Sequence, residues 1–348
     1  MATRRRSVTL EAVAERAGVS LKTASNAVNG TGRMADATRE RVLAVVAEME
    51  YKVNVAARNL TLGRTGAVTL ALPTLKAAYL AELAEGVMVA ARELDLVVYV
   101  TTVPDDATHG SRDYLRRFNV HQSDGLLFSM AEQEQLGPED FEVDYPLVCL
   151  GSRSVFGVVD RVSTDDVADA RAAAAYLYDR GSTSIGIVGA RVPFDAATIA
   201  TETQGNAEQR MRGVLEASLA VGRSIDPRLV GVTGYDWGIG KGFRATREII
   251  ASGVPFDGLV CLNDGLAVGA ISALLEHGLR VPDDVQVIGF DNIEESAFLT
   301  PSLTTMDSRI EWIARTALER LVARIDGEQG RPTDLVARSR LLTRGTTR

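Results

Sequence analysis

Short polar side chains in the stretch LKTASNAV, residues 21–28, are of the types that read the edges of nucleic-acid bases. Helical spacing would place its alanines and Val28 on one side and its polar residues on the other. Hydroxyl and amide groups bond to base edges, whereas lysine and arginine at the margins bind phosphates. The polar side consists of Lys22, Thr23, Ser25 and Asn26.

Two short helices must hold this polar side in place. Thr9 is suited to cap a helix that begins at Leu10, and Gly18 is suited to end it in a left-handed turn. Ser20 can then cap the second helix. The pattern predicts a helix, a tight glycine turn and a second helix, a motif whose second helix enters the major groove of DNA. The inner side of the first helix carries Leu10, Val13, Ala14 and Ala17.

A third helix is expected over residues 37–50, capped by Asp36. Its apolar positions recur at helical spacing and would complete a small core. Pattern alone leaves an alternative open, which is a three-helix bundle whose polar side binds nothing. The apolar positions are Val42, Val45, Val46 and Met49.

Charge is distributed unevenly along the chain. Residues 1–65 carry eleven basic and six acidic side chains, a net charge of +5, while the whole chain has a net charge of -8. The remaining residues therefore carry -13. A basic head on an acidic body indicates that the head, and not the body, binds a polyanion.

The first sixty residues resemble the N-terminal signature of the LacI/GalR family of bacterial transcription regulators. The resemblance lies in VTLEAVAERAGVSLKTASNAVNG, residues 8–30, and continues through TRERVLAVVAEMEYKVNVAARNL, residues 38–60. It implies a helix-turn-helix DNA-binding domain over residues 1–53, a hinge over 54–65 and an effector-binding domain over 66–348.

The resemblance also implies which residues contact a double-stranded DNA operator. In the family the hinge becomes helical on operator DNA, and its leucine, here Leu60, enters the minor groove as an apolar wedge. The alternative for Leu60 is an ordinary apolar residue that anchors a linker. The implied contacts are Thr9, Ser20, Lys22, Thr23, Ser25, Asn26, Asn29, Asn54, Ala57, Arg58 and Leu60.

Two positions of this region depart from the family pattern. Val53 stands where a proline often precedes the hinge asparagine, and Asn26 stands where the second helix often has arginine. An asparagine there could read adenine through two hydrogen bonds. The operator sequence is therefore not predictable.

After residue 66, apolar strands alternate with helices. Strands are expected at AVTLAL, LVVYVT, DGLLF, SIGIVG, DGLVCL and VQVIGF, with helices near 79–93, 110–119, 206–220 and 265–277. Such alternation is typical of parallel sheets covered on both faces, and the length favours two lobes with a shared cleft.

The resemblance continues over this part, more weakly. It implies an all-α helix-turn-helix head followed by a two-lobed α/β domain like a periplasmic sugar-binding protein, with three crossovers between the lobes. The first lobe would comprise about 66–163 and 296–326, and the second about 164–295 and 327–345. The matching pieces include LVCLNDGLAVGA, GLRVPDDVQVIGFDN and TPSLTTM.

Six residues are implied as the binding site for a small effector, such as a sugar. A guanidinium fork at Arg210 suits hydroxyls or carboxylates, and Trp237 could stack on the apolar face of a pyranose. The alternatives are purely structural roles: Arg210 could be a surface arginine, and Asn263 and Asp291 could be helix caps. The six are Tyr79, Asp166, Arg210, Trp237, Asn263 and Asp291.

The first lobe departs most from the family. Residues 77–80, AAYL, replace the usual Asn-Pro-Phe-Phe, Asp166 replaces asparagine, and Asp169 stands where glycine is usual. Residues 191–209, RVPFDAATIATETQGNAEQ, are longer than the usual loop before the arginine. The effector is therefore expected to be unusual for the family, or the pocket partly degenerate.

Other classes of function lack their motifs. Neither glycine run, 186–190 or 238–242, makes the dinucleotide-binding pattern, so no cofactor is expected, and no catalytic or zinc motif is present. A dehydrogenase would need the dinucleotide-binding pattern. A sugar transport protein would need a secretory leader, and the N-terminal residues do not resemble one. Cys149 and Cys261 lie in apolar runs and suggest free thiols in a reducing cytoplasm.

The predicted mechanism is ligand-controlled DNA binding, most simply as a repressor. Two chains would pair through their sensing domains and place two heads on a near-palindromic operator. A homodimer is expected because no heptad tail follows the last strand, and no apolar run is long enough to span a membrane. Whether the ligand releases or recruits DNA is not predicted.

Overall fold

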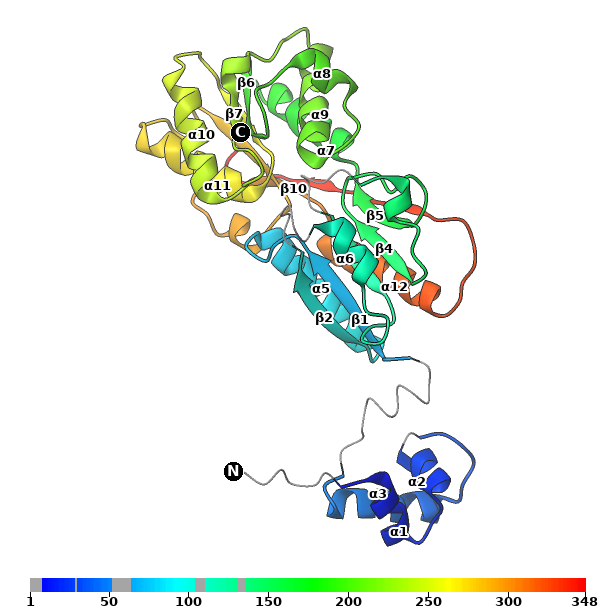
Figure 1. The fold of residues 1–348 in the computed structure, drawn as a ribbon. Helices are drawn as coiled ribbons and strands as arrows, with labels where there is room; N and C mark the ends of the chain where they lie inside the picture. The colour runs from blue at the N-terminus through cyan, green and yellow to red at the C-terminus, as the bar shows by residue number, and fades with distance from the viewer. Residues whose placement is uncertain (1–7, 29, 52–63, 104–109, 131–135) are drawn as a thin grey trace, which may run out of the picture. The chain divides into compact units, whose positions relative to one another are not determined.

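The computed structural model describes residues 8–28, 30–51, 64–103, 110–130 and 136–348. The chain forms two compact units, Met1–Thr65 and Gly66–Arg348, called here the head and the body. Figure 1 shows that the head is helical and that the body combines helices with sheets. No helix of the described ranges is long and apolar enough to cross a membrane.

Three helices make up the described part of the head: α1 (Leu10–Ala17), α2 (Leu21–Val28) and α3 (Asp36–Glu48). The Thr9 hydroxyl accepts a hydrogen bond from the N–H of Ala12 at 3.3 Å, and Gly18 ends α1 at φ 66°. Ser20 caps α2, since its hydroxyl accepts from the N–H of Thr23 at 3.1 Å. The first two helices and their turn are therefore as predicted.

The third helix of the head begins and ends differently from the prediction. Asp36 is the first residue of α3 and not its cap, because Ala35 occupies the cap position and has no side chain to accept a hydrogen bond. The helix ends at Glu48 instead of residue 50. Its inner face nevertheless closes the core, whose buried residues are Val13, Ala14, Ala17, Ala24, Ala27, Val42 and Val45.

The first sheet of the body is wholly parallel, with strand order β11-β5-β4-β3-β1-β2. Helices α5 (Ala78–Glu93) and α12 (Ile310–Ile325) cover one face, and α6 (Ser111–Arg117) packs on the other (Figure 1). This unit is called the first lobe. Its strands are β1 (Ala67–Leu72), β2 (Val97–Thr102), β3 (Leu126–Ser129), β4 (Leu147–Leu150), β5 (Asp160–Thr164) and β11 (Asp334–Ala337), and a short 3-10 helix, η1, spans Pro138–Asp140.

The second sheet has the order β12-β10-β9-β8-β6-β7, and only β12 runs antiparallel to its neighbour. This unit is the second lobe. Its strands are β6 (Ile185–Ala190), β7 (Val230–Val232), β8 (Gly258–Cys261), β9 (Gln286–Phe290), β10 (Thr304–Asp307) and β12 (Arg340–Leu342). Its helices are α7 (Asp166–Asp179), α8 (Ala196–Thr201), α9 (Asn206–Ala220), α10 (Ile239–Ala251) and α11 (Asp264–Glu276), with 3-10 turns η2 (Pro227–Leu229) and η3 (Glu294–Ala297).

Helices of the second lobe pack in two close pairs, α7 with α9 and α10 with α11, on opposite faces of the sheet (Figure 1). Glycines permit the close approach. A Cβ on Gly213 of α9 would lie 2.3 Å from the carbonyl oxygen of Val167, and one on Gly269 of α11 would lie 2.0 Å from that of Ile239. The packing of α9 matters here because that helix carries Arg210.

The chain crosses between the lobes three times: from β5 to α7, from β10 to α12 and from β11 to β12. Two of the predicted lobe boundaries are therefore wrong. Residues 304–307, assigned to the first lobe, form β10 and pair with β9 of the second sheet. Residues 334–337, assigned to the second lobe, form β11 and pair with β5 of the first.

Candidate DNA-reading and effector sites

Helix α2 presents the polar side that the sequence predicts, but its members differ in exposure. Lys22 is exposed, whereas Thr23, Ser25 and Asn26 are half-buried. The hydroxyl of Thr23 lies 2.9 Å from that of Ser20, so the two share a hydrogen bond. The inward positions Ala24 and Ala27 are buried, as expected.

Asn26 lies against the turn that follows α2. A Cβ on Gly32 would come within 2.6 Å of the Asn26 amide nitrogen, and Gly32 has φ 74°, so this position accepts only glycine without strain. The glycine therefore leaves room for the amide at the side of the helix.

The hydroxyls of two predicted DNA contacts, Thr9 and Ser20, accept the hydrogen bonds that cap α1 and α2. Both residues are exposed, and their backbone N–H groups lie at helix N-termini, where phosphate is readily bound. The predicted contacts Asn29, Asn54, Ala57, Arg58 and Leu60 lie outside the described residues.

Arg210 forms the centre of the candidate effector site in the body. Its Nε donates to Asp166 at 2.7 Å and its Nη1 to the carbonyl oxygen of Leu262 at 2.5 Å. The guanidinium lies 4.6 Å from the ring centre of Phe290 and 5.9 Å from that of Trp237. Because Arg210 is only 7% exposed, this is a buried cation held by a carboxylate and two aromatic rings, and not a surface arginine.

Asp166 connects Arg210 to the first lobe. It is the first residue of α7, is 1% exposed, and also accepts a hydrogen bond from the hydroxyl of Ser152, in the loop between β4 and β5. The carboxylate thus lies between the guanidinium of one lobe and a hydroxyl of the other.

Asp291 is a second carboxylate close to Arg210. One of its carboxylate oxygens is 3.8 Å from Nη1 of Arg210, and the residue is 7% exposed. Burial raises its pKa to about 6, although the charge of Arg210 opposes that shift. Its backbone has φ 104°, an unusual value for a residue other than glycine, and such strain is often found at binding sites. Asp291 does not cap a helix.

The segment that carries Asp291 is anchored by a second buried aspartate. Asp264, fully buried at the start of α11, accepts from the N–H of Ile293 at 3.1 Å and from the hydroxyls of Ser296 at 2.6 Å and Thr305 at 2.7 Å. Burial, aided by the charge of Asp291, raises the pKa of Asp264 to about 7. The sequence suggested Asp264 only as a neighbour of Asn263.

Tyr79 reaches this group from the first lobe, at the start of α5. Burial raises the pKa of its hydroxyl above the ordinary value, with further contributions from Asp291 and Asp166 and an opposing one from Arg210. The hydroxyl therefore stays protonated and can donate a hydrogen bond. Four of the six predicted effector residues, Tyr79, Asp166, Arg210 and Asp291, act on one another here.

Trp237 and Asn263 are close to this group, but their polar side-chain atoms already form hydrogen bonds within the protein. The indole N–H of Trp237 donates to the carbonyl oxygen of Gly189 at 3.0 Å. The Asn263 amide caps α11 by accepting from Leu266 N–H at 2.7 Å, and it donates to the Trp237 carbonyl at 3.2 Å. Asn263 is thus a helix cap that also holds the Trp237 loop.

Further contacts join the lobes near Arg210, and no pattern in the sequence predicted them. The side chain of Gln209 donates to the carbonyl oxygen of Ser152 at 3.1 Å, and that of Gln204 accepts from the N–H of Ser154 at 2.9 Å. Elsewhere, the Glu82 carboxylate on α5 accepts from the N–H of Glu294 at 3.0 Å. Gln204 and Gln209 lie in the segment 191–209 that is longer than the family loop.

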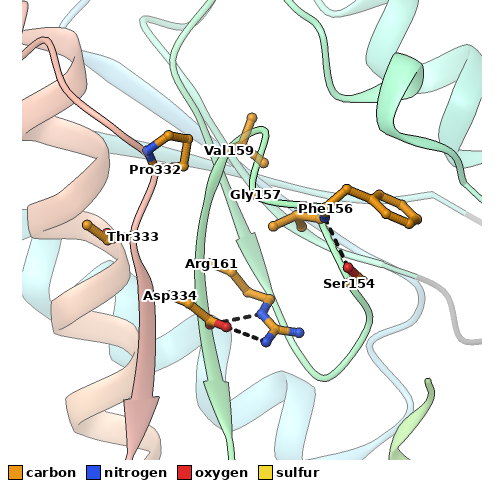
Figure 2. Close-up of a pocket in the computed structure, with 9 residues that line it drawn as sticks. Ser154, Phe156, Gly157, Val159, Arg161, Pro332, Thr333 and Asp334 are labelled. Atoms are coloured by element: carbon orange, nitrogen blue, oxygen red, sulfur yellow. Dashed lines mark hydrogen bonds and ion pairs between the residues drawn. The ribbon is translucent and has the colours of Figure 1, made fainter. Parts of the chain in front are cut away.

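A separate hollow lies in the first lobe, at the edge formed by β5 and β11 (Figure 2). The Arg161 guanidinium and the Asp334 carboxylate form an ion pair across it, with Nε to Oδ1 at 2.9 Å. None of the six predicted effector residues lines it. Its lining is Ser154, Val155, Phe156, Gly157, Val159, Arg161, Pro332, Thr333 and Asp334.

The described residues show no arrangement suited to a metal or a disulfide. No group of three or more His, Cys, Asp or Glu side chains in the described ranges is placed to hold a metal ion. Cys149 and Cys261 are free and buried, and burial raises the pKa of both thiols.

Comparison with known proteins identifies both units. Residues 9–54 match the family described as bacterial regulatory proteins, lacI family, and residues 174–347 match the periplasmic binding protein-like domain. The chain is 30% identical over 311 residues to the HTH-type transcriptional regulator DegA of Bacillus subtilis, which covers 87% of each protein.

Solved structures agree. A LacI-type transcription regulator from Bifidobacterium animalis is 32% identical, with a TM-score of 0.77 over 81% of this chain and 99% of that one. The transcriptional regulator CelR, solved as a complex with cellobiose, is 27% identical, with a TM-score of 0.69 over 97% and 99% of the two chains.

Proposed function

Because this chain belongs to the LacI family of bacterial regulatory proteins, and is a ligand-responsive DNA-binding transcription regulator and not an enzyme, we propose how its two units divide that work. The head reads an operator through α2, and the body binds a sugar or a related metabolite at Arg210. The effector-binding role of the body is supported by one observation: Tyr79, Asp166 and Asp291 all interact with the buried guanidinium of Arg210.

In the head, Lys22 binds phosphate while Ser25 and Asn26 reach base edges. This assignment follows from their place on the side of α2 away from its buried alanines. Thr9 and Ser20 contribute the N-terminal ends of α1 and α2 to phosphate binding. For the hinge, the proposal keeps the roles that the sequence implies, with Leu60 as the wedge in the minor groove and Asn54, Ala57 and Arg58 beside it.

In the body, the effector contacts both lobes. Arg210 and Asp291 belong to the second lobe, and Tyr79 belongs to the first, so a ligand between them favours one arrangement of the lobes. To reverse a 1:99 ratio of two states, it must bind one state about 10⁴-fold more tightly than the other. CelR was solved with cellobiose, which supports a sugar as the ligand class.

We also propose that the protein acts as a homodimeric repressor in the cytoplasm, where its DNA lies. A two-fold symmetric dimer would present two heads to the two halves of a near-palindromic site. Two free, buried cysteines fit a reducing compartment.

The DNA part is tested by selecting operator-like duplexes from a random pool with the full chain and measuring their affinity by fluorescence anisotropy. The logarithm of the affinity should fall with the logarithm of salt concentration by about 0.9 per phosphate neutralised. Asn26→Ala should reduce the preference for the selected sequence, by ~1–3 kcal/mol if it reads one base pair. Glu40→Ala, at an exposed position on α3, is the control. A salt slope near zero, or equal effects of the two variants, would refute the assignment.

The effector part is tested by a thermal-shift screen of sugars and related metabolites. A true effector should raise the melting temperature of the body and change operator affinity. A compound that stabilises Arg210→Met as much as the natural chain binds elsewhere and would contradict the proposed site.

A further inference from the structure

The loop between β4 and β5, residues 151–159, joins the first lobe to the second and is called here the bridge loop. Its Ser152 contacts the second lobe through two groups. The hydroxyl donates to the carboxylate of Asp166, and the carbonyl oxygen accepts from the side-chain amide of Gln209 at 3.1 Å. Asp166 in turn accepts from Arg210 at 2.7 Å. The place of one serine therefore decides whether the first lobe is bonded to the buried ion pair of the candidate effector site.

The bridge loop has an irregular backbone that depends on support from elsewhere. Three of its residues have positive φ: Gly151 at 106°, Phe156 at 54° and Gly157 at 71°. Such a segment cannot pair its carbonyl groups in a regular ladder, so other groups must supply the donors. The carbonyls of Ser152 and Arg153 find theirs in one side chain of the neighbouring strand.

That side chain is Arg161, on β5. Its Nη1 donates to the carbonyl oxygen of Arg153 at 3.0 Å and to that of Ser152 at 3.4 Å. Its Nε and Nη2 donate to the two carboxylate oxygens of Asp334 at 2.9 and 2.5 Å (Figure 2). Asp334 is the residue of β11 that pairs in register with Arg161. The planar guanidinium is thus fixed to β11 on one side and holds the bridge loop on the other.

The bonding of Arg161 decides between three roles for it. Because all three of its guanidinium nitrogens have partners, the hollow in Figure 2 offers an anion no unpaired nitrogen of Arg161. Because the Asp334 side chain is 52% exposed, water can replace Arg161 there, and the ion pair adds little to the stability of the fold. The bonds to the two loop carbonyls remain as the contact with a consequence for the effector site, through the position of Ser152.

We propose that Arg161 is a positioning residue of the sensing domain, which holds the bridge loop so that Ser152 bonds Asp166 and the lobes keep the arrangement described above. Its influence reaches Arg210 through Ser152 and Asp166, and it touches no effector itself. The inference rests on the proposed function in one respect, that the arrangement of the lobes controls the head. A contiguous set of contacts predicts energetic coupling between its members, which a double-mutant cycle measures directly.

The test measures the distance between the lobes of the full chain without any ligand. Spin labels are attached at two exposed positions, Gln122→Cys in the first lobe and Asp179→Cys on α7 of the second, and their separation is measured by double electron–electron resonance. Cys149 and Cys261 are buried and stay unlabelled. Dilution with unlabelled chain restricts the signal to pairs within one chain. Each hydrogen bond lost between the lobes should favour separated lobes by about two- to tenfold, seen as a growing population at longer distance.

Arg161→Met and Ser152→Ala should each enlarge the population of separated lobes. In the double variant the two effects should combine to much less than their product, because Arg161 acts through the position of Ser152. Arg315→Met is the control: Arg315 also bonds a carboxylate of the first lobe through two nitrogens, that of Glu93 at 2.6 and 2.9 Å, and its loss should leave the distances unchanged. Natural distances in Arg161→Met, or effects that multiply in full, would overturn the positioning role.

Arg161→Lys serves as a second variant that keeps a positive charge beside Asp334. One ammonium group cannot bond the carboxylate and both carbonyls as the planar guanidinium does, so the lobes should separate in this variant too. If Arg161→Met does not fold, natural distances in Arg161→Lys would overturn the proposal.

Operator affinity of the same variants separates this inference from the proposed function. It is measured by anisotropy for the chain alone and with glucose, galactose, mannose, ribose or cellobiose. Separated lobes with an unchanged operator affinity would support the role of Arg161 and contradict the control of the head by the lobes. Natural distances in the Arg161 variants, with a sugar that still alters operator affinity, would refute the role of Arg161 and support the proposed function.

Discussion

The pairing of Arg210 with Asp166 permits a quantitative prediction about the stability of the body. In Arg210→Leu, Asp166 stays 1% exposed and loses its cationic partner, and the carbonyl of Leu262 loses its donor. Removing one partner of a buried ion pair typically costs ~3–5 kcal/mol, because the remaining charge is left in a medium of low dielectric constant. We expect the free energy of unfolding of the body to fall by about that amount at neutral pH.

The assay is urea unfolding followed by tryptophan fluorescence. The chain has two tryptophans, Trp237 and Trp312, and both belong to the body, so the signal reports on that unit alone. A double-mutant cycle with Asp166→Leu separates the pair from the rest. The double variant should be more stable than the sum of the single losses predicts by at least ~1 kcal/mol, since it leaves neither charge unpaired.

A matched control is available on the surface. Arg228 and Asp226 also form an ion pair at 2.7 Å, but the Arg228 side chain is 66% exposed. Arg228→Leu should change stability little, because water replaces the lost partner. The reasoning is refuted if Arg210→Leu costs no more than Arg228→Leu, or if the losses in the cycle simply add.

Three further predictions follow from the contacts of the body. Burial opposes the ionisation of Asp160, but hydrogen bonds from Arg324 and Thr333 hold its pKa at about 2. The ionised carboxylate therefore contributes stability that is complete above about pH 4 and is lost as the pH falls toward 2. Acid titration of Asp160→Asn should therefore show a smaller loss over that interval, and an unchanged profile would contradict the assignment. Gln204→Ala removes a hydrogen bond between the lobes worth ~0.5–1.5 kcal/mol, so effector binding measured by calorimetry should weaken up to about tenfold. The control Gln122→Ala, at an exposed position in the first lobe, should leave the effector affinity unchanged. Equal affinities for both variants would show that the contact does not stabilise the bound state. Because burial raises the pKa of Asp291 to about 6, in the presence of Arg210, Asp166 and Glu82, a ligand that donates to its ionised form should bind less tightly as the pH falls below about 6, and binding independent of pH from 5 to 7 would argue against that contact.

Local signals in the sequence were sufficient for the helix-turn-helix and for the longest strands. Thr9, Gly18 and Ser20 act where their side chains or φ preferences predict, and β1 spans the predicted AVTLAL. The prediction that Asp36 caps the third helix was wrong, because an acidic residue is favoured in the first turn of a helix as well as at the cap position. The residue pattern by itself predicted no strand or helix between residues 129 and 184, although β4, β5 and α7 lie there.

The crossovers could not be located from local pattern. The strands β10 and β11 have four residues each, too few to show a pattern of their own. β11 pairs with β5, as Asp334 with Arg161 far earlier in the chain, whereas β10 pairs with the nearby β9, as Thr304 with Ile288. Such non-local pairing leaves no periodicity in the sequence, so the family resemblance supplied the number of crossovers but not their positions.

The candidate effector site was predicted in part. The resemblance identified four residues that meet in the structure, Tyr79, Asp166, Arg210 and Asp291. It did not indicate that Asn263 uses its amide as a helix cap. Nor did it indicate the contacts of Ser152 and Gln204, because these depend on how a loop of one lobe meets an insertion in the other.

The central claim is that a small molecule bound at Arg210 controls binding of DNA by the head. The most direct measurement is the affinity of the full chain for its selected operator, with and without a saturating effector found in the screen, in the natural chain and in Asp291→Asn. The account predicts that the effector changes operator affinity at least tenfold in the natural chain and much less in the variant, with both proteins binding operator equally well alone. An effector response of the same size in both proteins would contradict it.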